Sequence, residues 1–252
     1  MIIESRKFIF NTVNVILEDD KLEGIIKSGK YSKISATTYA EKDLPGFDVL
    51  TKTTALISLG EKEDDILGKF NDTTRNEIRR TYKNKNLKFV TDDKNFDESY
   101  SLYKDFEYTQ GRVPVSGKEL KKIKLFAAYF KEEMISAIYV AESFPYLRIR
   151  SIFSKRLKTD DKETRKIISN ATRRLTWEVC LWGKKNNFKS LDMASVNFKN
   201  PKTATITKFK MSFGGKVVNE YTYIYKSNWF KFFEKFVFVK IRLLKLINGS
   251  FV

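Results

Sequence analysis

Apolar residues along this chain recur with two different periods, which predict a mixture of helices and strands. Aromatic residues follow helical spacing in FDESYSLYKDFEYTQGR, residues 96–112. Three runs rich in apolar and β-branched residues come next: FAAYFK, MISAIYVAE and YLRIRSIFS. The breaks between them, at Glu132-Glu133 and Phe144-Pro145, are typical of hairpins. The pattern therefore predicts an antiparallel meander in the middle of the chain.

The segments on either side of this meander predict further strands and helices. Residues 2–17 indicate a strand or a strand–helix boundary, and residues 49–59 a strand. An acidic run, EKEDD, opens a helix, and TTRNEIRRTYKNK forms another with Asp72 or Thr73 as its N-cap. The last third predicts a long basic helix, the strand SLDMAS, a short helix over 202–211 and the strand VVNEYTYIY. This order favours a mixed, mostly antiparallel sheet flanked by helices, with crossovers only in its second half.

Composition narrows the classes of protein and of chemistry. The 252 residues include 48 Lys and Arg against 31 Asp and Glu, a formal net charge of +17 that favours polyanionic partners or simply a solvated surface. The chain has no histidine, which excludes His-based triads, and one cysteine, which excludes internal disulfides and cysteine metal clusters. We expect Cys180 to be a buried structural thiol and expect no metal site. The first residues lack a signal-peptide pattern, so we expect a cytoplasmic protein.

Short motifs in a specific order resemble the GNAT acyltransferase superfamily, and within it the Fem-type transferases that build peptidoglycan cross-bridges. The segments concerned are WEVCLWGKKNNFKSLDMAS, the turn FKMSFGG, and TALISLGEKEDDILGKFNDTTRNEIRRTYKNKNLKF, together covering roughly residues 50–226. The resemblance implies a GNAT fold over 96–226 and a degenerate GNAT-like unit over 1–95. The long helical-hairpin arm of the bridge-forming enzymes has no counterpart here.

The same resemblance implies an acyltransferase that acts on an amine of a nucleotide- or lipid-linked cell-envelope precursor, such as a peptidoglycan or polysaccharide intermediate. GNAT enzymes that use acetyl-CoA carry a glycine-rich pyrophosphate loop at the start of the long helix, but residues 155–176 contain no glycine. Arg165, Ser169 and Asn170 are the nearest substitutes for donor binding. We expect an acyl-CoA-type thioester as donor, with aminoacyl-tRNA as the alternative. A non-catalytic nucleic-acid- or membrane-binding protein on a GNAT scaffold is the second alternative.

Three residues are candidates for catalysis. Lys210 matches a lysine of the Fem-type FKxxFGG turn, which the resemblance implies stabilises the transfer transition state; a solvated helix-end charge is the alternative. Asp192 ends the apolar strand SLDMAS, where it could accept the amine proton or brace a loop. Tyr223 belongs to an alternating tyrosine stripe and could be a general acid or a packing residue. Glu178 is a further possible base, and pairing with a nearby cation is the simpler interpretation.

Arginines and a tyrosine are candidates for binding the acceptor. Arg75 and Arg79 are four residues apart on a predicted helix and so share a face, where guanidinium groups suit phosphate oxygens. Arg112 and Tyr108, at the end of the aromatic helix, could line the same cleft. A solvated basic face and an ordinary helix end are the alternatives.

The end of the chain, 227–252, predicts a basic amphipathic helix. In NWFKFFEKFVFVKIRLLKLI the cations Lys231, Lys235, Arg242 and Lys245 fall in one sector of a helical wheel and apolar residues fill most of the rest. This pattern favours a helix in the interface of an anionic membrane, contacting it through residues 228–247. We therefore expect a peripheral location at the inner face of the cell membrane. Docking on its own domain or on a second subunit is the alternative.

Overall fold

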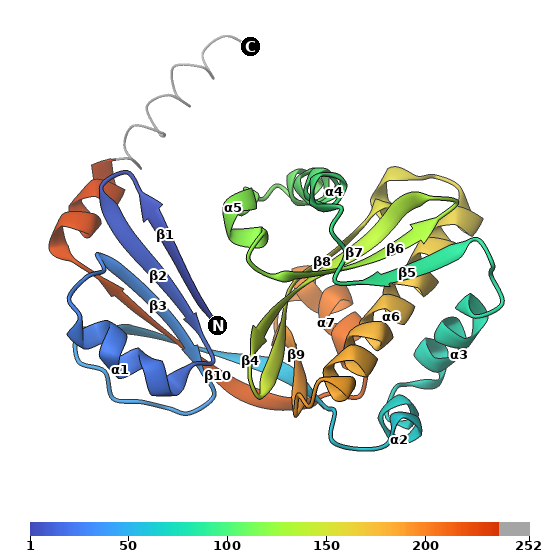
Figure 1. Cartoon of the computed structure of the whole chain (residues 1–252), viewed down its shortest axis with the longest axis horizontal. Helices are drawn as coiled ribbons and strands as arrows, with labels where there is room; N and C mark the ends of the chain where they lie inside the picture. The colour runs from blue at the N-terminus through green and yellow to red at the C-terminus, as the bar shows by residue number, and fades with distance from the viewer. Residues whose placement is uncertain (237–252) are drawn as a thin grey trace, which may run out of the picture. The chain divides into compact units, whose positions relative to one another are not determined.

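The computed structural model describes residues 1–236, apart from the side chains of Lys7 and Lys202 (Figure 1). The chain forms two compact units, one made of Met1–Thr51 with the residues from Glu220 onward, and the other of Lys52–Asn219. We call them unit 1 and unit 2. The predicted division into 1–95, 96–226 and 227–252 follows family resemblance rather than compactness, and stays a prediction.

Unit 1 is a small sheet with a helix packed on it. The strands β1 (Ile2–Lys7) and β2 (Phe10–Ile16) form an antiparallel hairpin, and β2 pairs in parallel with β3 (Lys33–Thr38). The last part of β10 (Lys216–Lys226) pairs antiparallel with β3. Alternate residues of these strands and Leu22 of α1 (Asp19–Lys27) form the core: Val13, Val15, Leu22, Ile34, Ala36 and Tyr223. Residues 228–236 are helical, and the rest of the predicted tail helix lies outside the described residues.

Unit 2 contains the meander and the long helix. Its strands lie in the order β4, β9, β8, β7, β6, β5. Their bounds are β4 (Asp48–Ser58), β5 (Leu87–Thr91), β6 (Lys124–Phe130), β7 (Glu133–Ser143), β8 (Tyr146–Ser154) and β9 (Ser190–Val196). The predicted hairpins β6–β7 and β7–β8 are confirmed as antiparallel pairs. β5 pairs with β6 but was not predicted, because five residues are too few to show a clear period.

Helices cover both faces of this sheet. The long helix α6 (Lys162–Lys185) packs on one face, and α4 (Phe96–Thr109) and α5 (Gly117–Leu120) cover the other. The remaining helices are α2 (Glu63–Gly68), α3 (Asp72–Thr81), η1 (Lys155–Lys158), η2 (Pro201–Thr203) and α7 (Ala204–Met211). A mostly antiparallel sheet flanked by helices confirms the predicted fold class. The expectation that crossovers occur only in the second half was wrong, because α1 connects the parallel strands β2 and β3.

Two local features of the helices bear on the predictions. The N-cap of α3 is Asn71, whose Oδ1 accepts a hydrogen bond from the Thr74 amide at 2.8 Å, so the prediction of Asp72 or Thr73 was one or two residues late. Cys180 is confirmed as buried, and burial raises the pKa of its thiol.

Among the described helices, none has the length and apolar character needed to cross a bilayer.

Candidate functional site

Strands β8 and β9 separate in the middle of unit 2. They run parallel, but only Tyr146–Arg148 of β8 and Ser190–Asp192 of β9 are in register. Beyond these residues β8 continues to Ser154 and β9 to Val196, each pairing with its other neighbour. Backbone N–H and C=O groups on the two facing edges therefore lack strand partners. Such groups can bind an extended ligand as an added strand would be bound.

Both strands carry a bulge where they separate. In β8 one extra residue, Arg150, stands between Ile149 and Ser151, which pair with adjacent residues of β7. In β9 the register with β4 shifts between Asp192 and Ser195, where Ala194 has a positive φ of 58°. Bulges increase local twist and redirect side chains, so they explain why the strands diverge here.

Asp192 is fully buried and holds this bend together. One carboxylate oxygen accepts from the Ala194 amide at 2.7 Å and from the Thr54 hydroxyl, and the other from Arg148. The exposed fractions of Asp192 and Arg148 are 0% and 7%. Because the carboxylate is enclosed, this geometry favours the bracing role over proton transfer with a substrate. Its assignment as a base stays a prediction.

Lys210 lies at the carboxyl end of β9. Its ammonium group donates a hydrogen bond to the Ser195 carbonyl at 2.9 Å, and the side chain is half-buried. The turn after it requires glycine, since Gly214 has a φ of 67° and a Cβ there would stand 2.2 Å from the Lys69 carbonyl oxygen. The FKxxFGG turn thus fixes α7, and with it the cation, against the end of the strand.

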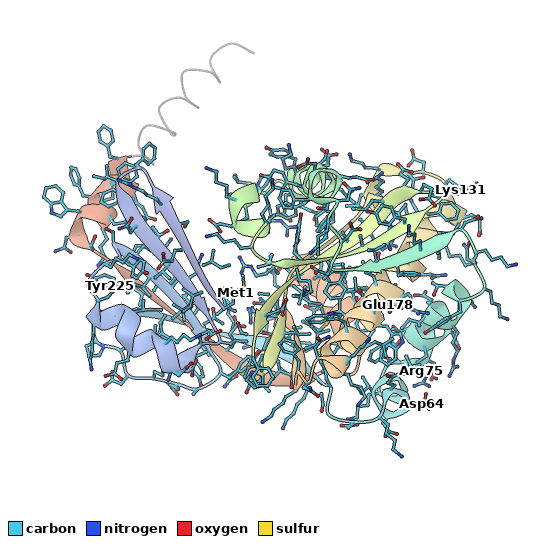
Figure 2. The ribbon with its side chains drawn as sticks, viewed as in Figure 1. Met1, Asp64, Arg75, Lys131, Glu178 and Tyr225 are labelled. Atoms are coloured by element: carbon cyan, nitrogen blue, oxygen red, sulfur yellow. The ribbon has the colours of Figure 1, made fainter. Side chains whose placement is uncertain are left out.

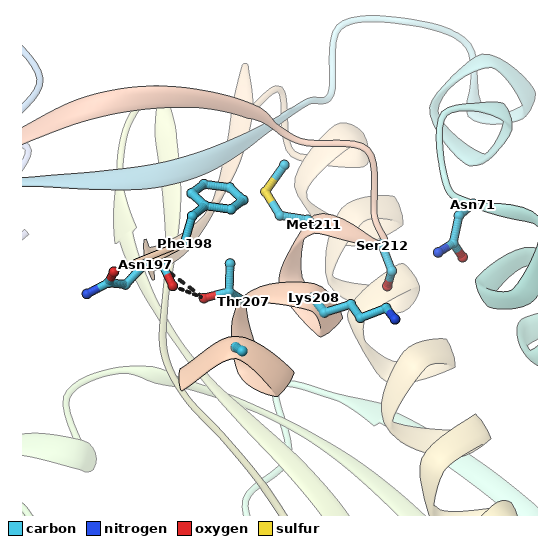
Figure 3. A pocket seen from close by; sticks show the side chains of 8 residues that line it. Asn71, Asn197, Phe198, Thr207, Lys208, Met211 and Ser212 are labelled. Carbon is cyan, nitrogen blue, oxygen red and sulfur yellow. Dashed lines mark hydrogen bonds between the residues drawn. The ribbon is translucent and has the colours of Figure 1, made fainter. Parts of the chain in front are cut away.

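A pocket of about 390 Å³ opens beside α7 (Figure 3). It is lined by Asn71, Asn197, Phe198, Ala204, Thr207, Lys208, Met211 and Ser212. The Thr207 hydroxyl is held by the backbone of Asn197, accepting from its amide at 3.0 Å and donating to its carbonyl at 3.1 Å. Figure 3 shows Lys208 extending along the side of the pocket that carries Ser212 and Asn71. A partly apolar pocket with one exposed cation suits a ligand with both an apolar part and a negative charge.

The residues predicted to bind the donor lie on the first turns of α6. Asp161 caps this helix by accepting from the Thr164 amide at 2.8 Å. Arg165 donates to the Thr159 carbonyl and pairs with Asp160, and Ser169 accepts from Arg173 at 2.8 Å. Asn170 is buried and its Oδ1 has no hydrogen-bond partner. Because a carboxylate already occupies the cap, the N-terminus of α6 is a poor site for a second anion.

The predicted acceptor-binding residues lie on two helices, Arg75 and Arg79 on α3 and Tyr108 and Arg112 at the end of α4, and their common cleft stays a prediction. Arg75 donates to the Gly68 carbonyl at 2.7 Å and the Phe70 carbonyl at 2.6 Å, beside the short helix that carries Asp64 (Figure 2). The Arg112 guanidinium donates two hydrogen bonds to Glu107, each of 2.7 Å. In this structure both guanidinium groups therefore bind groups near the ends of helices. Arg79 and Tyr108 are exposed and stay predictions.

The last two candidates have packing partners. Tyr223 is fully buried in the core of unit 1, and its hydroxyl accepts from the Lys42 amide at 2.6 Å. It therefore belongs to a different unit from Lys210 and Asp192, and its role as an acid stays a prediction. Glu178 accepts a hydrogen bond from Arg174 at 2.5 Å, which agrees with the pairing interpretation.

Two arginines of β8 were missed by the sequence reasoning. Arg148 pairs with Asp192, and Arg150 is the exposed bulge residue. In the described part of the chain no carboxylate lies within ion-pair distance of Arg150, so it is available to a ligand. The available signal was the alternation of arginine with apolar residues in YLRIRS, since cations are rare in a strand that otherwise reads as buried.

Comparison with known proteins supports the fold. No family model matches the chain, and no curated protein matches it. FemX matches with a TM-score of 0.62 and 10% identity, covering 88% of this chain and 83% of that one. The C-terminal domain of a putative lysylphosphatidylglycerol synthetase from Agrobacterium fabrum has a TM-score of 0.55, 11% identity, and coverages of 88% and 80%. L-PGS from Bacillus licheniformis has a TM-score of 0.51, 14% identity, and coverages of 90% and 81%. The resemblance to the Fem-type, GNAT-like group is thus confirmed at the level of the fold.

Proposed function

We propose that this chain transfers an acyl or aminoacyl group from an activated donor to an amine of a nucleotide- or lipid-linked cell-envelope precursor. The observation that carries the proposal is the position of Lys210, whose ammonium binds the Ser195 carbonyl at the carboxyl end of β9, three residues beyond Asp192, where β8 and β9 are last in register. The fold similarity to FemX supports it.

The chemistry needs few protein groups. An amine attacks the carbonyl carbon of the donor, the new C–N bond forms, and the bond to the leaving oxygen or sulfur breaks. The amine proton ends on the departing alkoxide or thiolate, so no histidine is required. Lys210 would offset the negative charge that develops on the carbonyl oxygen, and unpaired backbone amides at the strand edges would align the donor.

One observation favours aminoacyl-tRNA as the donor over the predicted acyl-CoA thioester. A coenzyme A pyrophosphate at the start of α6 would meet Asp161, which caps the helix, together with Asp160 and Glu163. An aminoacyl ester does not depend on this position. The name of one similar structure, a putative lysylphosphatidylglycerol synthetase, includes a lysyl group and is consistent with this choice.

The test compares the two donors directly. The full chain is mixed with labelled acetyl-CoA or with labelled aminoacyl-tRNA, and both binding and transfer to a UDP-linked amino sugar are measured. We expect Lys210→Ala to reduce the transfer rate about 100-fold or more while donor binding changes little. Lys131→Ala, which removes an exposed cation in the turn between β6 and β7, is the control and should have no effect. Absence of binding by either donor at micromolar concentration would contradict the proposal.

A further inference from the structure

Unit 1 exposes a group of large apolar side chains at one end. Phe8 and Ile9 form the turn of the β1–β2 hairpin and are 78% and 76% exposed. On the helix 228–236, Trp229, Phe232 and Phe236 are 77%, 66% and 65% exposed. Figure 1 shows this helix, in red, beside the β1–β2 turn. We call these five residues the aromatic patch.

Ring contacts join the turn to the helix. The Phe8 ring meets the Phe233 ring edge-on with centroids 5.1 Å apart, and Phe10 contacts Phe233 at 5.2 Å and Phe230 at 5.3 Å. Phe230 is buried beneath them. The outward residues Trp229, Phe232 and Phe236 follow a spacing of three and four, so they form one stripe of the helix. Turn and helix therefore present one connected apolar surface.

The residue at the first position of the turn is unfavourable for the backbone conformation there. Phe8 has a φ of 55°, a conformation in which a two-residue hairpin turn strongly favours glycine. The chain instead holds a bulky aromatic residue there and leaves it exposed. Such a local conflict is typical of a site retained for binding.

The charges around the patch are positive. Arg6 is exposed and donates to the Phe8 carbonyl at 3.1 Å, and Lys231 and Lys235 are exposed on the helix side next to the apolar stripe. Glu234, the only acidic residue in 227–252, is paired with Lys226 and Lys33 on the side that faces the sheet. Further cations follow in the sequence at Lys240, Arg242 and Lys245.

We propose that the aromatic patch docks on an anionic lipid bilayer, with the β1–β2 turn and the helix 228–236 inserting together. Aromatic side chains bury their rings at the acyl boundary, while adjacent lysines and arginine contact the headgroups. The sequence had indicated the tail alone. The hairpin turn adds a second, rigid insertion element from the other end of the chain.

The test uses a turn variant that should not destabilise the fold. Phe8→Gly with Ile9→Asn places the preferred residues in the turn and removes the Phe8–Phe233 contact, while Phe10 still contacts Phe230 and Phe233. The gain in the turn offsets the lost contact, so the melting temperature should change little. Binding of the full chain to vesicles of phosphatidylcholine with about 30% phosphatidylglycerol should nevertheless weaken about tenfold or more. Leu157→Ser, at an exposed apolar residue of unit 2, is the control and should bind as the wild type does.

Tryptophan fluorescence reports insertion into the vesicles, and sedimentation measures the bound fraction and the oligomeric state. Trp229 is exposed, whereas Trp177 is buried and Trp182 is partly buried against the core of unit 2. Anionic vesicles should therefore shift the emission to shorter wavelength, and Trp229→Phe should remove most of that shift. Added salt should weaken binding. The proposal is overturned if the wild type does not bind anionic vesicles, or if the turn variant binds them as tightly as the wild type. It is also overturned, in favour of self-association, if the turn variant instead dissociates a dimer.

Discussion

Asp192 and Arg148 form an ion pair inside unit 2, at the last registered position between β8 and β9. Two further donors, the Thr54 hydroxyl and the Ala194 amide, satisfy the carboxylate. A buried charge needs such complete pairing, because removal of one partner leaves the other without solvation. Asp192, a candidate catalytic residue in the sequence, thus lies at the point where β8 and β9 separate and holds the bend of β9.

Asp192→Asn should therefore be strongly destabilising. The Arg148 guanidinium would remain buried without its counter-charge, at a cost of about 3–5 kcal/mol in the free energy of unfolding. Urea titration measures this change. Asp160→Asn is the matched control, since Asp160 is exposed and its pairing with Arg165 contributes little. Lost transfer activity with unchanged stability would instead identify Asp192 as a catalytic group.

The turn after Lys210 could be predicted because its glycines form a continuous motif in the sequence, whereas the catalytic role of Lys210 stays a prediction. Arg150 and Asn71 could not, since their roles depend on partners distant in the chain: a bulge opposite β7 and a pocket against α7. The pairing of Arg112 was also missed, although its partner is close in sequence. Its carboxylate partner, Glu107, is only five residues away, and the aromatic spacing gave no sign of the pair.

The turn between α7 and β10 shows how one element depends on its close neighbours. Gly214 passes so near the Lys69 backbone that no side chain fits, and a Cβ on Gly215 would stand 3.2 Å from the Ala55 Cβ. The turn thereby sets where α7 ends and where its lysines lie. Apolar strands of seven or more residues were predictable from their composition, whereas the short strand β5 and the bulges arise from pairing and were not.

Replacing Gly214 by alanine should destabilise unit 2 by about 3 kcal/mol or more, from the steric clash and the unfavourable φ together. Gly24→Ala is the control. Gly24 lies inside α1, where an added Cβ would meet nothing within 4 Å, so the change should stabilise by about 0.5–1 kcal/mol. Thermal unfolding of both variants gives the comparison, and equal melting temperatures would contradict the steric account.

At the scale of the whole molecule, the mixed fold followed from the order of periodic segments, and the fold comparison agrees with it. The net charge of +17 favours polyanionic partners or a solvated surface and gives no position for a partner, so the class of partner stays a prediction. That unit 1 combines the two ends of the chain could not be predicted, because residues far apart in sequence share no local pattern. For the same reason, the sequence did not show that Phe8 and Trp229 belong to one aromatic patch.

Stability at alkaline pH is a property of the whole molecule that a single tyrosine should influence. Burial raises the pKa of Tyr139 to about 12, despite a hydrogen bond of 2.8 Å with the Ser99 hydroxyl. Since the unfolded pKa is near 10, the unfolded chain releases this proton first. The contribution is fully present below pH 10 and is lost progressively as pH rises toward 12.

The free energy of unfolding should thus fall between pH 10 and pH 12, and Tyr139→Phe should make that fall shallower. Denaturant titrations at several pH values measure the slope. Tyr82→Phe, at an exposed tyrosine, should leave the slope as in the wild type. An identical slope in both variants would show that other groups account for the loss.

The discontinuity of unit 1 has a consequence for synthesis on the ribosome. Unit 2 is the continuous stretch Lys52–Asn219, so all its residues emerge before the second part of unit 1, which begins at Glu220. β3 must wait for β10, which is translated more than 170 residues later, before it gains its antiparallel partner. The first fifty residues therefore emerge with an unpaired strand edge, and their fold is completed only after residues 221–226 of β10 have been made.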